Sequence, residues 1–138
     1  MKLILISTLM CFSISISANE VDITEVKAKQ QKDKLWRFDV TLKHDDKDWD
    51  HYANEWQILA PDNKILGTRT LYHPHVNEQP FTRSLHSIKI SADINLVRVI
   101  AKDTVHGLST KVIEVDLSTQ KIKTLSLNDI KKDYLNKK

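Results

Sequence analysis

The chain has 138 residues, a formal net charge of +3, two glycines and a single cysteine. This length suits one domain that buries a core without crosslinks. Since Cys11 lies in an apolar N-terminal run, the rest of the chain has no thiol, which excludes disulfides, zinc–thiolate and blue-copper sites, and thiol catalysis. No concentrated basic stripe is present, so we expect no nucleic-acid partner.

The first 18 residues have the pattern of a secretory signal peptide. A positive start at Lys2 precedes an apolar run over 3–12, and small residues over 13–18 offer a cleavage site after Ala18. The residues before Cys11 suit lipid attachment poorly. We therefore expect a freely exported, soluble protein, periplasmic in a Gram-negative source. No later segment is long and apolar enough to span a membrane.

Alternation with a period of two dominates the remaining chain. In the segment 35–42, Trp36, Phe38, Val40 and Leu42 face one way and mostly polar residues face the other, as in a sheet with one buried face. The same pattern and the turn residues predict seven strands, at 21–29, 35–42, 53–60, 65–72, 81–90, 96–103 and 111–117. These indicate an all-β, antiparallel sandwich of the immunoglobulin or fibronectin type, with Trp56 as a buried tryptophan. A small barrel is the alternative.

We place the sandwich domain at 19–120 and a basic tail at 121–138. Within the tail, Ser126 and Asp129 indicate the start of a short helix over 127–136.

Five of the six histidines fall in the predicted connections. His44 and His51 lie between the second and third strands, His73 and His75 between the fourth and fifth, and His106 between the sixth and seventh. Since successive strands reverse direction, these three connections share one end of the sandwich.

Imidazoles that converge from separate loops indicate a metal site. Pro74 favours an extended His73, so that His73 and His75 point to the same side. We do not expect His44, which leads an acidic loop, or His86, which lies within a strand, to be ligands. The sequence predicts a site made of His51, His73, His75 and His106, with Glu78, Asp50 and Asp103 as further ligands or orienting groups.

Neutral imidazoles with an open coordination position suit Cu(II) or Zn(II). The first hypothesis is therefore an exported, non-catalytic module that sequesters or transfers one of these ions. Ordinary exposed loop histidines are the competing interpretation. We expect no enzyme, because the chain lacks a nucleophile elbow, a glycine-rich phosphate loop and an H-E-x-x-H motif. A metal-dependent hydrolase is the third hypothesis.

The second hypothesis is an immunoglobulin-like module that binds a protein or glycan through the same loops without metal. Its anchors would be Trp49, Tyr72 and Arg83, because aromatic and arginine side chains dominate such contacts. We expect Trp49 to fold back over the end of the core rather than stand exposed, and Arg83 to pair with an acidic neighbour.

Two segments carry a resemblance to known sequences: W-D-H-Y-A over 49–53 and H-P-H-V-N-E-Q-P-F-T-R-S-L over 73–85. They resemble a family of small secreted bacterial proteins with no assigned activity, and the similarity extends over about 49–107. The resemblance implies that these residues form one unit, and it supplies neither a ligand nor a reaction. The acidic run over 45–48 and the lysine-rich C-terminus depart from it.

Overall fold

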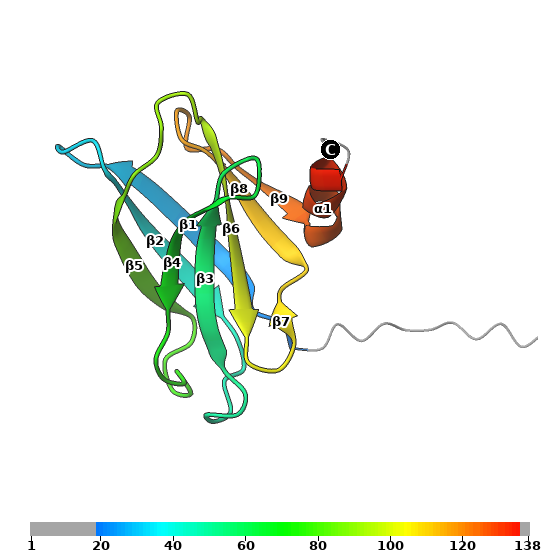
Figure 1. Ribbon diagram of the computed structural model, residues 1–138. Coiled ribbons are helices and arrows are strands. Elements are labelled where there is room, and N and C mark those ends of the chain that lie inside the picture. The colour runs from blue at the N-terminus through cyan, green and yellow to red at the C-terminus, as the bar shows by residue number, and fades with distance from the viewer. Residues whose placement is uncertain (1–18, 136–138) are drawn as a thin grey trace, which may run out of the picture.

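The computed structural model describes residues 19–135 as two antiparallel β-sheets and a short C-terminal helix (Figure 1). The predicted signal peptide lies outside these residues. The antiparallel sandwich predicted from the sequence is confirmed.

Each sheet contains strands from both halves of the chain. Sheet A has the order β1-β2-β5 and consists of β1 (Asp22–Gln30), β2 (Trp36–Lys43) and β5 (Phe81–Ile88). Sheet B has the order β4-β3-β6-β8-β9, and β7 pairs with β6. Its strands are β3 (Ala53–Leu59), β4 (Ile65–Thr70), β6 (Leu96–Asp103), β7 (Gly107–Leu108), β8 (Lys111–Asp116) and β9 (Ile122–Ser126).

The core lies between the inner faces of the two sheets. Phe38, Val40 and Leu42 alternate along β2 and are fully buried, and so are Trp56 and Ile58 on β3. Each such side chain contributes about 1.5–3 kcal/mol by leaving water. Alternating burial along β2 is what the sequence pattern requires of a sheet with one buried face, whereas β6 is buried on both faces over 97–101.

The sandwich continues past residue 120, where the sequence analysis placed its end. β9 pairs with β8 over the register from Lys111↔Ser126 to Val115↔Ile122. The sequence pattern did not reveal β9 because a mostly exposed edge strand has no buried face to mark it. The helix α1 (Leu127–Leu135) follows, and Ile130 packs with Leu59, Ile100 and Val112 in a second, smaller cluster.

Three connections lie at the same end of the sandwich, as predicted: β2–β3, β4–β5 and β6–β7 (Figure 1). We call this end, formed by residues 44–52, 71–80 and 103–106, the loop end. It carries five of the six histidines.

Candidate metal centre

One group of potential metal ligands stands out at the loop end. Among residues 19–135, His44, His51 and Asp103 each offer one ligand atom, and these atoms all lie within 4.8 Å of one another. Strand pairing explains why His51 lies near Asp103. β3 pairs with β6 so that Ala53 lies opposite Asp103, and His51 precedes Ala53 by two residues. His44 directly follows β2.

Asp103 is held rigidly at the base of the group. Its buried carboxylate accepts hydrogen bonds from the backbone N–H groups of Val105 (2.8 Å) and His106 (2.7 Å), and the Nδ1 atom of His106 lies 3.1 Å away. Burial acts to raise the pKa of the Asp103 carboxyl, but these hydrogen bonds outweigh burial and lower the pKa below its usual value. Asp103 is therefore a fixed anion that faces the histidines.

His51 occupies the middle of the group. Its ring centroid lies 5.0 Å from that of His44 and 5.0 Å from that of His106. Its Nε2 atom is buried without a hydrogen-bond partner in the described residues and lies 3.7 Å from Oδ1 of Asp103. A ring nitrogen that faces a carboxylate at this distance is stabilised by a proton or by a cation, because a bare lone pair there would meet only negative charge.

His44 already has two hydrogen-bond partners. Its Nδ1 atom lies 2.6 Å from Oδ1 of Asp46, and its Nε2 atom lies 3.0 Å from the backbone oxygen of Asn19. Asp46 also accepts hydrogen bonds from the backbone N–H groups of Ala53 and His75. Both ring nitrogens of His44 are therefore engaged with oxygen atoms of the protein. His44 could bind a metal only after its ring gives up one of these two contacts.

His73 and His75 form a second group, separate from this one. Their ring centroids lie 4.5 Å apart, and the ring of His75 stacks on Phe81 at 3.9 Å. The His75 ring is buried, and neither of its nitrogens has a hydrogen-bond partner among the described residues. Burial lowers the pKa of His75, and the positive charges of Arg83 and His73 lower it further. The rings of His73 and His75 lie together, as the H-P-H spacing predicted, but the group of ligand atoms within 4.8 Å contains His51 and neither of these two histidines.

The remaining predicted residues occupy the rim of the loop end. Glu78 forms a two-pronged ion pair with Arg83 (3.1 and 2.9 Å), so Arg83 does have the acidic neighbour expected from the sequence. Asp50 is exposed and contributes no atom to the metal group. Trp49 is 66% exposed, so the prediction that it folds over the core is wrong; its ring packs edge-on against Tyr52 instead. Tyr72 is 77% exposed.

Sequence reasoning missed two residues, His44 and Asp46, although a signal was present. The alternation of β2 continues beyond its last residue, so that His44 and Asp46 are buried in phase with Leu42, while Lys43 and Asp45 are exposed. The acidic composition of the loop concealed this phase, because acidic runs are usually solvated.

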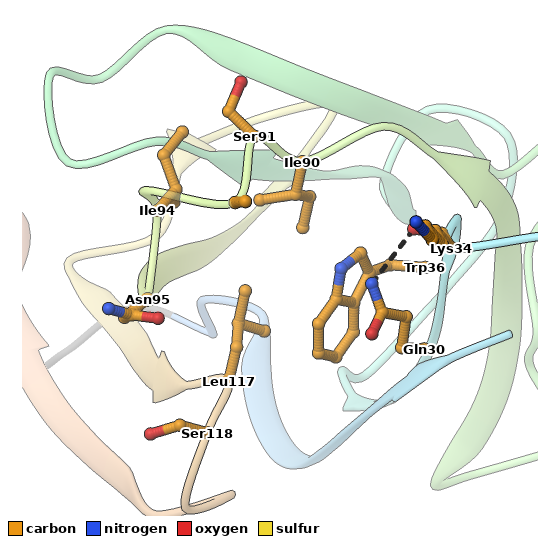
Figure 2. A pocket seen from close by; sticks show the side chains of 10 residues that line it. Gln30, Lys34, Trp36, Ile90, Ser91, Ile94, Asn95, Leu117 and Ser118 are labelled. Atoms are coloured by element: carbon orange, nitrogen blue, oxygen red, sulfur yellow. Dashed lines mark hydrogen bonds between the residues drawn. The ribbon is translucent and has the colours of Figure 1, made fainter.

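A different kind of cavity lies at the opposite end of the sandwich. It measures about 410 Å³ and is bordered by apolar side chains of Trp36, Ile90, Ile94 and Leu117, with Gln30 and Asn95 at its edges (Figure 2). It contains no histidine or acidic residue. This cavity therefore offers no side chain that would bind a transition-metal ion.

Fold and site together define an antiparallel β-sandwich whose loop end carries a histidine–aspartate cluster that could hold a metal ion. The chain is 33% identical over 101 residues to a protein of Halomicrobium mukohataei described as "Putative lipoprotein". The match covers 73% of this chain and 49% of that protein, so the chain spans about half the length of its relative. No protein-family model and no solved structure matches the chain. Within residues 19–135, no helix has the length and apolarity needed to cross a membrane.

Proposed function

We propose that the protein binds one Cu(II) or Zn(II) ion at the loop end, through His51, Asp103 and a further imidazole from His44 or His106. The observation that carries this proposal is the buried, unpartnered Nε2 atom of His51, which faces the fixed carboxylate of Asp103. A cation between these two groups would satisfy both at once.

The spacing of the group supports binding after a small closure. Ligand atoms around a tetrahedral zinc ion lie roughly 3.3 Å apart, given metal–ligand bonds of about 2.0–2.1 Å. The three candidate atoms lie within 4.8 Å of one another, so side-chain rotations of His44 and His51 could bring them to this spacing. His106 is partly exposed and donates to Asp103, so it can orient that carboxylate or rotate to become a ligand itself.

We propose that the module sequesters or transfers the ion outside the cytoplasm and does not catalyse a reaction. The predicted signal peptide and the lipoprotein description of the relative support export. Placement of the site on loops, near the surface, suits exchange of the ion with a partner. The hydrolase hypothesis makes a different prediction, because a hydrolase loaded with Zn(II) would cleave ester or phosphoester substrates.

The test uses residues 19–138 purified without a histidine tag. Calorimetric titration with Zn(II) and with Cu(II), in a non-coordinating buffer, should give close to one ion per chain. His51→Ala and Asp103→Asn should each weaken binding at least about tenfold, since even supporting residues of metal sites cause losses of this size.

The matched control is His86→Ala, which removes the exposed histidine on β5 and should leave the affinity unchanged. The double variant His73→Ala/His75→Ala removes two ligands of the set predicted from the sequence and none of the ligands proposed from the structure, so it distinguishes the two ligand sets. Binding that survives His51→Ala but disappears in the double variant would overturn the proposed ligand set. Absence of stoichiometric binding by the unaltered protein would overturn the function.

One observation favours the second function, binding of a protein or glycan partner. Trp49 and Tyr72 are large aromatic side chains left 66% and 77% exposed on two connections of the loop end. Exposed aromatics of this kind commonly serve as contact anchors. Trp49→Ala/Tyr72→Ala should then abolish recovery of a partner from extracts of the source organism, while metal affinity stays intact. Equal recovery by the variant would remove this candidate.

A further inference from the structure

A cavity of about 320 Å³ opens on one side of the loop end, between the edge strands of the two sheets. β4 is the edge strand of sheet B and β5 is the edge strand of sheet A, and they lie side by side (Figure 1). Arg69 comes from β4, Arg83 from β5, and His73 and His75 from the connection between them. This cavity is distinct from the candidate metal centre, which shares none of these residues.

Strand register directs both arginines toward the space between the sheets. Residues directly opposite each other in an antiparallel pair project to the same face. Arg69 lies opposite the buried Trp56, and Arg83 lies opposite the buried Val40. Both guanidinium groups therefore emerge from core-facing positions, which is an unusual place for two cations.

Gly67 marks the position where β4 and β5 come into close contact and the space between the two sheets is closed. A Cβ atom on Gly67 would lie 2.5 Å from Cδ1 of Ile88 and 3.0 Å from Cδ2 of Leu85, so β4 and β5 are in close contact there. Arg69 is the next core-facing residue of β4 toward the loop end. β4 and β5 are therefore in tight apolar contact at Gly67, and two residues further along β4, at Arg69, the cavity begins.

The charges in the cavity are not balanced by the residues that line it. No acidic side chain lines the cavity. Glu78 neutralises Arg83 from the exposed rim, but the side chain of Arg69 has no hydrogen bond or ion pair among residues 19–135, and its Nε atom is buried. A guanidinium group offers five donors, and a buried donor left unmatched costs about 1–3 kcal/mol.

We propose that this cavity binds a small oxyanion, a phosphate or carboxylate group, with Arg69 as its main partner. The planar guanidinium group matches either anion in a two-pronged geometry. Tyr72, His73 and His75 also line the cavity and carry a hydroxyl group and two imidazoles that can act as further donors. Burial of the anion beside Arg69 would provide the acceptor that the chain itself does not.

To test this, metal-free protein comprising residues 19–138 is titrated with phosphate and with acetate and observed by NMR. Inorganic phosphate should shift the side-chain Nε–H signal of Arg69 and the ring signals of His75 in a saturable way. Arg69→Gln should weaken the affinity at least about tenfold, the scale of one hydrogen bond to a charged group. Arg69→Lys keeps the charge without the planar fork and should give an intermediate loss.

Arg37→Gln is the matched control, since Arg37 lies on β2, pairs with Asp39 and does not line the cavity. It should bind phosphate like the unaltered protein. Comparison of inorganic phosphate, glycerol 3-phosphate and acetate identifies whether the site prefers the free ion, a phosphate ester or a carboxylate. Failure of all three to shift Arg69 at tens of millimolar, or equal binding by Arg69→Gln, would overturn the proposal.

Discussion

At the scale of single residues, Asp46 is the polar centre of the loop end. Its buried carboxylate lies beside the ring of His44 and accepts hydrogen bonds from the backbone N–H groups of Ala53 and His75. The side chains of His44 and Asp46 are both fully buried. A carboxylate with this many donors holds the start of β3 and the β4–β5 connection in place.

Asp46→Asn is expected to destabilise the fold by roughly 3 kcal/mol. The amide would keep one acceptor but turn an N–H donor toward the backbone donors of Ala53 and His75, and each buried hydrogen-bonding group left unmatched costs about 1–3 kcal/mol. Urea unfolding of both proteins measures the difference. Asp93→Asn, at an exposed turn, should stay within about 0.5 kcal/mol of the unaltered protein. Equal losses in the two variants would contradict the role of Asp46.

The buried ring of His75 predicts a loss of stability in mild acid. Its pKa is lowered, first by burial and then by Arg83 and His73, so below the usual histidine pKa of about 6.5 the unfolded chain takes up a proton that the folded chain does not. His75 therefore reduces the free energy of unfolding as the pH falls from about 6.5 to its folded pKa, by up to about 1.4 kcal/mol per pH unit. Above pH 6.5 it contributes no slope.

Urea unfolding at a series of pH values checks this expectation. The slope between neutral and mildly acidic pH should be reduced in His75→Gln relative to the unaltered protein. An unchanged slope would mean that His75 becomes protonated in the folded state as readily as in the unfolded chain.

At the scale of elements, the approach of β4 to β5 depends on Gly67. Gly67→Ala would gain about 0.5–1 kcal/mol from the reduced freedom of the unfolded chain, but the new methyl group would meet Ile88 at 2.5 Å and overpacking costs about 1–3 kcal/mol. We expect net destabilisation of about 1 kcal/mol.

A double-mutant cycle makes this prediction specific. Ile88→Val removes the Cδ1 atom that the new methyl group would strike, so Gly67→Ala should cost less in that background than alone. Denaturant unfolding of the four proteins gives the coupling. Additive effects would show that the β4–β5 contact is not what requires glycine.

Strands with one buried face were the easiest to predict. The strong alternation of Trp36 to Leu42 placed β2 almost to the residue, while β4, which has no fully buried residue, followed from the turn residues before it. β7 has two residues and β9 is mostly exposed, so neither strand has enough buried apolar residues to produce a recognisable alternation of apolar and polar residues. The predicted helix at the C-terminus is present, and it packs Ile130 onto the second cluster.

The candidate site was predictable in its location and not in its membership. Strand alternation was sufficient to bring five histidines to one end, because antiparallel strands reverse direction each time. Which imidazoles meet depends on side-chain packing: His75 stacks on Phe81, and His44 turns inward to Asp46. A spacing such as H-P-H carries no information about such long-range contacts.

At the scale of the whole molecule, the metal proposal links binding to folding stability. His44 and His51 come from the β2–β3 connection and Asp103 from the end of β6, and these segments meet only in the folded chain, so an ion that binds them stabilises that state. Free Zn(II) at 100 times its dissociation constant should add about 2.7 kcal/mol, or about 10 °C in Tm for a domain of this size. Addition of a chelator should reverse the shift.

Calorimetric melting of the unaltered protein and His51→Ala provides the measurement. The variant should melt at the same temperature with and without Zn(II). A shift of equal size in both proteins would show that zinc stabilises the fold from another position.

One consequence of the place of Asp46 concerns the two proposed sites together. Its Oδ1 atom contacts the ring of His44, which is one of the candidate metal ligands, and its Oδ2 atom accepts a hydrogen bond from the backbone N–H of His75, which lines the oxyanion cavity. A single carboxylate therefore contacts residues of both sites. An ion that moves the ring of His44 would also change the hydrogen bond between Asp46 and the backbone N–H of His75. Thermodynamic reciprocity then requires that acetate change zinc affinity by the same factor by which zinc changes acetate affinity. Asp46→Asn should bring this coupling factor closer to one.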